Sequence, residues 1–532
     1  MSLIYNISII FILIFITILI SITYFNNQNE QIVFRLTVRN GKLDKANDCT
    51  DLLMKNDLIV AEIRQQIKEL FDLVGTSVNY DKNDKAIDSR NEFIRRQFGR
   101  LLGQVEGLSG QTYNTHKTEL DRLAQHLKTV LYKLQYPVDC SKTRLLVCSM
   151  SFLCGFGCLA HHAGQDDGEK MVYKAKWVDV FLPITNCSYK EHVLPFLPLA
   201  EYKSTPQQER IVFLKQRADT IGLTHMPELA PTEYKEILLK HHTDPPAWFM
   251  GQLIGFVLRQ NEVTHQKVKD IESKFNLTNG SETFAGIHVR RTDKAREAAF
   301  HELEEYIKWI DFWYTSTNLN NTLLNKRRLF ISTDEPDKII AEAEKRWGSQ
   351  YVLLHNSIKG FYGKDERDPQ RHSINSLISL VIELHFLAKC KFVVCTLTSN
   401  VCRLVYELMQ DYQGYAGGNV YSLDSRYAEI WYHEKMISIA DYKGSNEDEI
   451  DAIKGDIISG ACAISNPKKR KKRPWSLVLY NNCLSDINEH KSNGFVNAEN
   501  TRTNKKGRFP ISLLIKELKF ESFPILALNE TI

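Results

Sequence analysis

The sequence has little net charge. It holds 68 lysines and arginines against 64 aspartates and glutamates, so its formal net charge is only +4 over 532 residues. A protein that binds nucleic acid electrostatically presents a strong positive field, which this balance does not supply. Apolar residues make up 43% and charged residues 25%, an ordinary composition for globular domains. The length suffices for roughly two or three domains with cores of their own.

Charge is missing altogether from residues 3–24, "LIYNISIIFILIFITILISITY". A helix rises about 1.5 Å per residue, so this stretch is long enough to cross a hydrocarbon core of about 30 Å. It also lacks the basic region and the A-x-A-like cleavage site of a signal peptide. We therefore expect a transmembrane anchor at 3–24 rather than a cleaved leader or a core helix. No Lys or Arg precedes it, so charge does not define its orientation.

The eleven cysteines lack the spacing of a zinc site. Cys154 and Cys158 enclose "CGFGC", but no second pair of Cys or His follows at zinc-finger spacing. Cys395 and Cys402 enclose "CTLTSNVC". Short disulfides in an oxidising compartment fit both pairs better. Glycosylation sequons, N-x-S/T, occur at Asn186, Asn276, Asn279, Asn320 and Asn529. Together with the anchor, these features predict a membrane-tethered protein whose body lies in the secretory pathway.

The segments after the anchor differ in pattern. Residues 25–49 are polar and predict a spacer. Residues 50–136 carry helical apolar periodicity with interleaved charges, which predicts a helical stem. The stem has two interpretations that the sequence leaves open. It is either a coiled coil that pairs with a second copy or a helical cap on the core of the same chain.

Residues 137–426 alternate strand and helix patterns. Strand candidates are "RLLVCSM", "FAGIHV", "RRLFIST" and "KFVVCT", and helix candidates are 303–315, 337–346 and 375–388. This alternation predicts an α/β fold with a parallel sheet covered on both faces. Ligands of such sheets bind beyond the carboxyl ends of the strands. We therefore expect "HVRRTDK", "STDEPD" and "CTLTSN" to meet at one rim.

Residues 284–300, "FAGIHVRRTDKAREAAF", concentrate charge at one strand end. Adjacent arginines on an extended backbone point in different directions, so they seldom share a partner. One of Arg290 and Arg291 can grip a phosphate through two parallel hydrogen bonds, while the other holds neighbouring acids. Glu297 and Lys294 are then candidates for proton chemistry, with Asp293 neutralising the cluster. The alternative is a surface salt-bridge cluster worth about 0–1 kcal/mol, and we favour the functional site.

The motifs resemble a known family. "GIHVRRTDK" is followed by "EAAFHELEEY", "FISTDEPDKI" and "INSLISLVIELHFLAKCKFVVCTLTSNVCRLVYELMQ", and preceded by "DCSKTRLLVCSMSFLCGFGCLAHH". This series resembles the α-1,6-fucosyltransferases that add core fucose to N-glycans, in order, over most of residues 50–532. The resemblance implies an α/β, GT-B-like glycosyltransferase with a first catalytic subdomain at 137–283. Its second subdomain, at 284–426, would be a Rossmann-type GDP-fucose-binding domain.

The resemblance also implies an assembly and a location. An SH3-like β-barrel would occupy 433–532, carried by "ISIADYKGSNEDEIDAIKGDII" and "KKGRFPISLLIKEL". Family members are single-pass type II proteins of the Golgi membrane with the catalytic body in the lumen. They dimerise through the stem helices and the SH3-like domain, and we expect the same homodimer here.

Residue roles follow from the same resemblance. Arg290 would contact the β-phosphate of GDP, and Arg291 would be the second required arginine. Glu297 would be the catalytic base, supported by Asp293 and Lys294. The other expected substrate-binding residues are His288, Gly155, Phe156, Tyr306, Asp334, Glu383, Ser399 and Asn400. Cys140 and Cys187 complete the set of expected disulfide cysteines. The donor would be GDP-fucose and the acceptors N-glycoproteins, with no metal or other cofactor.

The chain departs from the family pattern at several places. Glu383 stands where the family has an aspartate for guanine recognition, and Asn400 replaces a glutamine after Ser399. Compared with the family pattern, residues 163–186 lack about one strand and one helix. Residues 463–491 form an insertion in the barrel. The missing piece would hold the partner of Cys148. Two explanations stay open for both changes, an error in the gene model and a genuine change.

The resemblance implies an inverting, metal-independent transfer of L-fucose to the 6-hydroxyl of the innermost GlcNAc. Two alternatives stay open: a fucosyltransferase with another acceptor, and a catalytically degenerate scaffold of the same family. The insertion holds a basic run within "PKKRKKRPW", which matches a nuclear-localisation pattern. In a chain with a lumenal body it would not meet the import machinery, so we expect a solvated loop there.

Overall fold

The structure is a computed structural model that describes a defined part of the chain. The described residues are 113–148, 177–197, 200–201, 209–214, 229–277, 283–292, 300–317, 327–356, 373–424, 427, 435–438, 440–444, 447–460, 495–510, 513–516 and 518–528. The expected anchor, the spacer, the stem before residue 113 and the insertion 463–491 lie outside these ranges. Among the described helices, none is long and apolar enough to cross a membrane.

A five-stranded parallel sheet forms the centre of the region expected to be the second subdomain, residues 284–426. Its strands are β5 (Ala285–Val289), β6 (Arg327–Thr333), β7 (Tyr351–His355), β8 (Phe392–Cys395) and β9 (Val420–Ser422), in the order β7-β6-β5-β8-β9. All four strand pairs are parallel. Every residue of β5 and of β8 is buried, because helices cover both faces of the sheet. The predicted parallel α/β sheet is therefore present.

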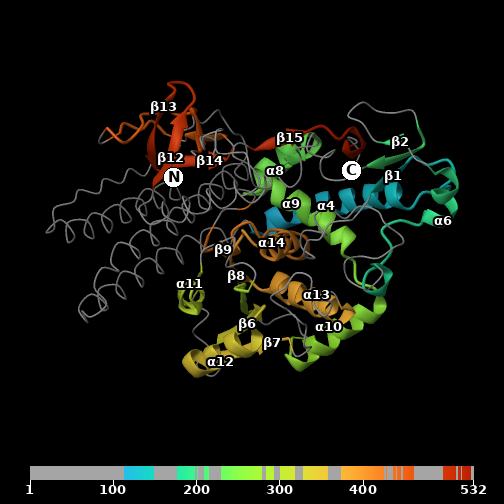
Figure 1. Cartoon of the computed structure of the whole chain (residues 1–532), viewed down its shortest axis with the longest axis horizontal. Helices are drawn as coiled ribbons and strands as arrows, with labels where there is room; N and C mark the ends of the chain where they lie inside the picture. Colours follow the sequence, from blue (N-terminus) through green and yellow to red (C-terminus); the bar gives the residue numbers. More distant parts are fainter. Residues whose placement is uncertain are drawn as a thin grey trace, which may run out of the picture.

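Four helices connect these strands. They are α11 (Leu303–Ser316), α12 (Pro336–Trp347), α13 (Ile374–Lys389) and α14 (Asn400–Gln413). The predicted helices 303–315, 337–346 and 375–388 match the first three to within one residue at each end. Figure 1 shows α11 and α12 on one side of the strands and α13 on the other. Alternate residues of each strand consequently belong to two different cores.

Helix α9 (Pro245–Val257) joins the sheet to the rest of the molecule. It is buried on nearly all sides, begins at the N-cap Asp244, which accepts from the backbone of Ala247, and continues from there as an apolar rod. Ala247 and Met250 belong to the core on the α13 and α14 face of the sheet, whereas Trp248 belongs to a separate core with α4 and α8. Helix α9 therefore packs against both cores and connects them.

Close approach between α9 and α14 depends on two glycines. A Cβ added to Gly251 would overlap the backbone carbonyl oxygen of Glu407 and would lie 3.0 Å from the Cβ of Gln410. A Cβ added to Gly255 would instead meet the carboxylate of Asp411, the end of a side chain. The two helices thus pack backbone to backbone at Gly251.

Helix α4 (Tyr113–Gln135) is the described end of the predicted stem. Leu120, Leu123 and Leu127 on one face are at most 1% exposed, and they pack in one core with residues of α8 (Lys235–His241) and α9. For this helix the structure agrees with the second interpretation of the stem, a cap on the core of the same chain. Residues 50–112 lie outside the described ranges.

The region expected to be the first subdomain, residues 137–283, has a small parallel sheet. Its strands are β1 (Leu145–Cys148), β3 (Ile211–Leu214) and β2 (Ala200–Glu201), in that spatial order. Helix α6 (Tyr189–His192) packs on it through Tyr189, and the other short elements of this part of the chain are the 3-10 turns Trp177–Asp179, Leu194–Phe196 and Thr232–Tyr234. A further helix, α10 (Glu262–Lys274), packs on α13, where Glu272 accepts hydrogen bonds from His385 (3.0 Å) and Lys389.

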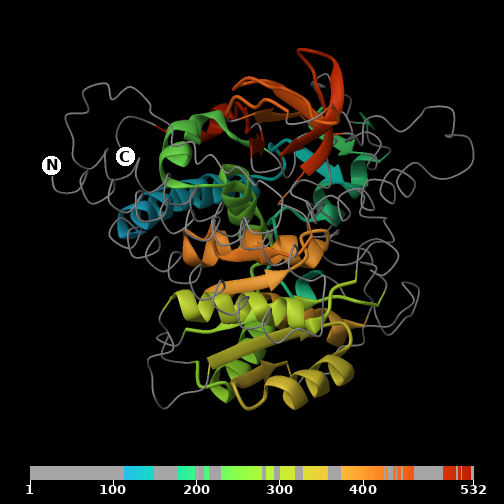
Figure 2. The same ribbon diagram turned by 90° about the vertical axis from the view of Figure 1, so that its left-hand side faces the viewer.

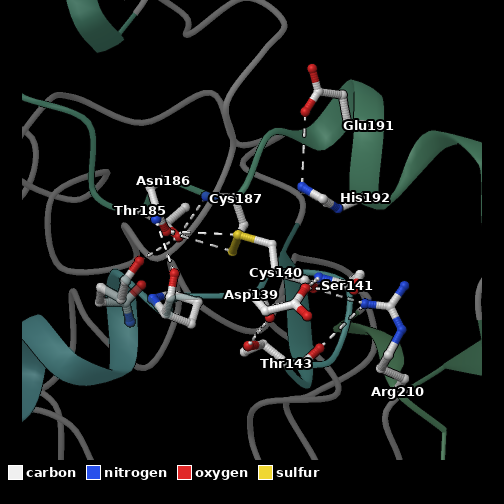
Figure 3. The surroundings of a disulfide bond; sticks show 12 residues. Asp139, Cys140, Ser141, Thr143, Thr185, Asn186, Cys187, Glu191, His192 and Arg210 are labelled. Atoms are coloured by element: carbon white, nitrogen blue, oxygen red, sulfur yellow. Dashed lines mark hydrogen bonds and ion pairs between the residues drawn. A yellow bond between two sulfur atoms is a disulfide. The ribbon is translucent and has the colours of Figure 1, made fainter.

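A disulfide between Cys140 and Cys187 fixes the segment after α4 to the start of α6 (Figure 3). Next to it the side-chain amide of Asn186 donates to the carbonyl of Pro137 at 3.1 Å, and Arg210 donates to the carbonyl of Cys140 at 3.2 Å. The disulfide therefore sits in a polar network that holds three separate segments together.

The C-terminal region contains an antiparallel sheet of five strands. They are β10 (Lys435–Ser438), β11 (Ile457–Gly460), β12 (Phe495–Asn500), β13 (Lys505–Pro510) and β14 (Leu514–Lys516), in the order β13-β12-β11-β10-β14. Its small core includes Ile450, Ile458 and Phe509. Figure 2 shows this sheet at one end of the molecule and the parallel sheet at the other, with α4 and α9 between them.

The last described residues leave this antiparallel sheet. Strand β15 (Lys519–Glu521) pairs in parallel with β4 (Leu229–Pro231), beside α8 (Figure 1). The following 3-10 turn, Pro524–Leu526, adds Leu526 to the core of α4 and α8, and Glu233 accepts from the backbone N–H of Phe523 at 2.9 Å. The expected domain at 433–532 therefore does not fold as a single sheet, because its end belongs to the first subdomain.

Candidate active site

The strand order of the parallel sheet reverses between β5 and β8. From β5 the chain proceeds outward to β6 and β7, and then crosses back to β8 on the other side. Open α/β sheets bind ligands at such a switch point, in the crevice beyond the carboxyl ends of the strands. Arg290 follows β5, Asp334 follows β6 and Ser399 follows β8. Because the three strands run parallel, the three predicted stretches meet at one rim, as the sequence predicts.

Asp334 ties the end of β6 to the loop after β5. Its Oδ1 accepts from the backbone N–H of Arg291 at 2.9 Å, and its Oδ2 accepts from the backbone N–H and the hydroxyl of Thr292 at 3.0 and 2.6 Å. Both carboxylate oxygens therefore serve the protein itself. Asp334 is a predicted substrate-binding residue, and its hydrogen bonds to Thr292 join two loops in a way that no local sequence pattern predicts.

Arg291 contacts protein groups at the start of α11. Arg291 is 8% exposed and lies against α11 and α12, where its guanidinium donates to the carbonyl of His301 at 3.0 Å. It stands 3.9 Å from the carboxylate of Glu302 and 4.5 Å from the ring centre of Phe300. Arg290 is half-buried at the rim, and its charge acts on His288. Arg291 therefore stabilises the segment before α11, and Arg290 is the arginine whose charge acts on His288.

His288 lies in a buried polar group with Ser332 and Glu383. Its Nδ1 is 3.0 Å from the hydroxyl of Ser332, which in turn donates to Glu383 Oε2 at 2.6 Å. Burial, and secondly the neighbouring charge of Arg290, lower the pKa of His288 to about 4. The imidazole is therefore neutral at physiological pH. Within the described part of the chain, its Nε2 is buried without a hydrogen-bond partner.

The loop between β8 and α14 is fixed from two sides. A disulfide joins Cys395 and Cys402, and Asp424 accepts from the backbone N–H (3.4 Å) and the hydroxyl of Thr398. Ser399 is the N-cap residue of α14, yet its hydroxyl makes no capping bond and is buried without a partner among the described residues. An uncapped helix N-terminus with a fixed hydroxyl offers donors to an anion.

The remaining predicted residues differ in their surroundings. Asn400, the first residue of α14, accepts from the guanidinium of Arg403 at 2.6 Å. Tyr306 is 1% exposed inside α11, edge-on to the ring of His301, and burial raises the pKa of its hydroxyl. Gly155, Phe156, Asp293, Lys294, Glu297 and the pair Cys154 and Cys158 lie outside the described residues. Tyr306 belongs to the core between α11 and the parallel sheet.

Comparisons with known proteins agree with the geometry. The family model "Alpha-(1,6)-fucosyltransferase N- and catalytic domains" matches residues 21–165 and 167–428, which is most of the chain. The two matched segments meet at residue 166, inside the stretch that is shorter than the family pattern.

Two relatives carry the name alpha-(1,6)-fucosyltransferase. The chain is 28% identical to the Caenorhabditis elegans protein over 517 residues, covering 91% of this chain and 84% of that protein. It is 25% identical to the Drosophila melanogaster protein over 438 residues, covering 77% of this chain and 63% of that protein. A mutant of Arabidopsis thaliana FUT1 in complex with GDP is 11% identical, with a TM-score of 0.28, and covers 60% of this chain and 79% of its own. That structural similarity is too low to support an argument.

The resemblance noted in the sequence is thus confirmed by the family model and by both relatives. The chain belongs to the alpha-(1,6)-fucosyltransferase family of glycosyltransferases.

Proposed function

We propose that this protein transfers L-fucose from GDP-fucose to the 6-hydroxyl of the innermost GlcNAc of N-glycans, in α-1,6 linkage. One observation supports this most strongly. The carboxyl ends of β5, β6 and β8 meet at the switch point, where the neutral, buried His288 and the following Arg290 belong to the end of β5 and the uncapped N-terminus of α14 follows β8. These groups suit the anionic pyrophosphate and the base of a nucleotide sugar, and the family name supplies the sugar.

The proposed chemistry is a single displacement. The acceptor oxygen bonds to the anomeric carbon of fucose while the bond from that carbon to the GDP oxygen breaks, which inverts the anomeric centre. Negative charge grows on the departing pyrophosphate. Arg290 and the N-terminus of α14 with Ser399 are suited to stabilise that charge, because fixed donors cost no reorganisation during the reaction.

The proton of the acceptor hydroxyl needs a base. We assign this role to Glu297, with Lys294 holding it ionised and Asp293 bracing the arginines. A positioned base contributes roughly 10² to 10⁴ in rate. Gly155 and Phe156 of "CGFGC" would close over the pyrophosphate. In this proposal no metal ion and no further cofactor takes part.

The proposal extends to architecture and location. The two α/β subdomains would form a GT-B-like pair, with the antiparallel sheet of β10–β14 as an SH3-like module. The segment 3–24 would anchor the chain as a type II protein of the Golgi membrane, with the body in the lumen. Two copies would associate through the stem before α4 and through the SH3-like module.

An activity assay tests the proposal. The whole chain is incubated with GDP-fucose and a biantennary glycopeptide, with and without a chelator, and the product linkage is determined. We expect fucose in α-1,6 linkage at the innermost GlcNAc and equal rates in both arms. Fucose on a different acceptor would identify a relative with another substrate. GDP-fucose binding without transfer to any glycan would identify a degenerate scaffold.

A further inference from the structure

Three buried polar side chains from three different elements form one chain of hydrogen bonds. His288 lies on β5, Ser332 is its register partner on β6, and Glu383 lies on α13. They are 4%, 1% and 6% exposed. The Ser332 hydroxyl stands between the other two, 3.0 Å from His288 Nδ1 and 2.6 Å from Glu383 Oε2.

The backbone explains why α13 reaches this histidine. Gly286 and His288 lie two residues apart, on the same face of β5. A Cβ at Gly286 would come within 2.6 Å of the Sγ of Cys390, which follows α13. The missing side chain lets β5 approach α13 closely. Two residues further along, the same face carries His288 toward Glu383, and the Ser332 hydroxyl fills the remaining gap.

The protons of this group can be assigned by counting. A serine hydroxyl has one proton, and an ionised carboxylate accepts only. The short bond to Glu383 therefore uses the proton of Ser332, so that the contact with His288 can form only if Nδ1 carries a proton and donates it. A neutral imidazole with a proton on Nδ1 has a lone pair on Nε2. That atom is buried and has no partner among the described residues.

We propose that Ser332 is a positioning residue that holds His288 as the Nδ1–H tautomer, so that Nε2 is a hydrogen-bond acceptor for an N–H or O–H group of the bound nucleoside. The inference rests on the proposed function, because a nucleotide-sugar donor supplies the ligand. According to this proposal, the ligand must offer a hydrogen-bond donor to His288. Ser332 sets this requirement without touching the ligand, because it holds the tautomer of His288.

The first test measures the tautomer in the whole chain without ligand. The protein is labelled with ¹⁵N histidine, and long-range proton–nitrogen spectra distinguish Nδ1–H from Nε2–H. The chain has 16 histidines, so His288 is assigned from the signals lost in His288→Gln. We expect Nδ1–H. If Glu383 carried the proton instead, both bonds would reverse and His288 would be Nε2–H, which would overturn the inference and leave the fucosyltransferase proposal intact.

The second test compares variants. In Ser332→Ala, the Nδ1 proton loses its acceptor and the Nε2–H tautomer becomes populated. If about a tenth of the molecules keep the competent tautomer, GDP binding weakens about tenfold. The KM for GDP-fucose should rise while kcat changes by less than about twofold. Ser332→Thr keeps the hydroxyl and should restore both the tautomer and the affinity.

A matched control removes a buried hydroxyl elsewhere. Ser438 on β10 is 0% exposed and donates to the carbonyl of Ala440. Ser438→Ala should leave the His288 tautomer and GDP affinity unchanged, so that a general effect on folding is excluded. A Ser332→Ala protein with wild-type tautomer and affinity would contradict the positioning role.

Ligand analogues identify the group that Nε2 accepts from. Inosine diphosphate lacks the exocyclic amine of guanine, and 2′-deoxy-GDP lacks a ribose hydroxyl. The analogue that lacks the donor should bind wild type about tenfold more weakly and should lose nothing more in His288→Gln. If the loss of affinity for each analogue simply adds to the loss from His288→Gln, neither missing group donates to Nε2. The proposed contact between His288 and the nucleoside would then be refuted. A wild-type chain that binds no GDP would refute it together with the proposed function.

Discussion

The close packing of α9 on α14 allows a quantitative prediction about Gly251. In Gly251→Ala, the new Cβ overlaps the carbonyl oxygen of Glu407 and lies 3.0 Å from the Cβ of Gln410. A backbone carbonyl inside a helix cannot move alone, so the two helices must separate. Overpacking of this kind costs about 1–3 kcal/mol or more.

A second effect acts in the opposite direction. Alanine is favoured over glycine within a helix by about 0.8–1.0 kcal/mol. Because the overlap is with backbone, we take the upper part of the overpacking range, about 2–3 kcal/mol. Subtracting the helical preference leaves a net destabilisation of about 1–2 kcal/mol, which lowers Tm by about 2–8 °C in a domain of about 150–250 residues. Helix α14 begins at the candidate site with Asn400, so its displacement should also weaken GDP binding.

The chain offers a matched control for this prediction. A Cβ at Gly255 meets the carboxylate of Asp411, the end of a side chain, so relief requires Asp411 to rotate and to weaken its 2.6 Å ion pair with Lys128 but leaves the helix backbones in place. Gly255→Ala should therefore cost less stability than Gly251→Ala. Thermal unfolding and denaturant titration of the two variants measure the difference. Wild-type stability in Gly251→Ala, or a larger loss in Gly255→Ala, would show that the two helices do not touch as described.

Four further predictions concern the site and the surface. Arg290→Lys keeps the charge and loses the two-pronged grip on phosphate, so turnover should fall by about 10²-fold or more, and near-normal turnover would exclude the assignment. Glu297→Gln should leave GDP affinity nearly unchanged while turnover on a glycopeptide falls by about 10²-fold, and normal turnover would mean that another group is the base. Asn276 is exposed with φ 53°, whereas the amide of Asn186 donates within the protein, so the mass shift removed by an endoglycosidase should become smaller by one glycan in Asn276→Gln and stay unchanged in Asn186→Gln. Hydrogen bonds from α13 hold the pKa of Glu272 at about 2, below its unfolded value, so Glu272→Gln should destabilise the protein at neutral pH. The difference in unfolding free energy between wild type and Glu272→Gln should narrow as pH falls from about 4 toward 2. A difference that stays constant would show that these hydrogen bonds are absent.

Local sequence pattern was sufficient to predict most of the strands and helices of the five-stranded parallel sheet region. The strand "RRLFIST" is β6 residue for residue, and the three helices between the strands were predicted to within one residue at each end. These segments are long and strongly periodic, and each is bounded by residues that stop it. The parallel sheet and the meeting of three strand ends at one rim then follow from the alternation of strands and helices, because parallel strands share an edge.

The alternation of side chains along an extended backbone predicts different directions for Arg290 and Arg291. It did not give the partners. Asp334 was expected at the ligand, but its oxygens bind the loop after β5, at Thr292. That bond depends on how two loops from different strands approach each other. The spacing of residues within either loop therefore does not predict this hydrogen bond.

Only the tertiary structure decided the partners that come from distant segments. Helix α4 has the periodicity of a coiled coil, and its burial against α8 and α9 shows which surface its apolar face covers. Strand β15 pairs with β4 far from its neighbours in sequence. Ser332 lies beside His288 because β5 and β6 pair in one register, and it meets Glu383 because a glycine lets α13 approach. Periodicity fixes which face of an element is apolar, but register and packing distance fix which polar groups meet on it.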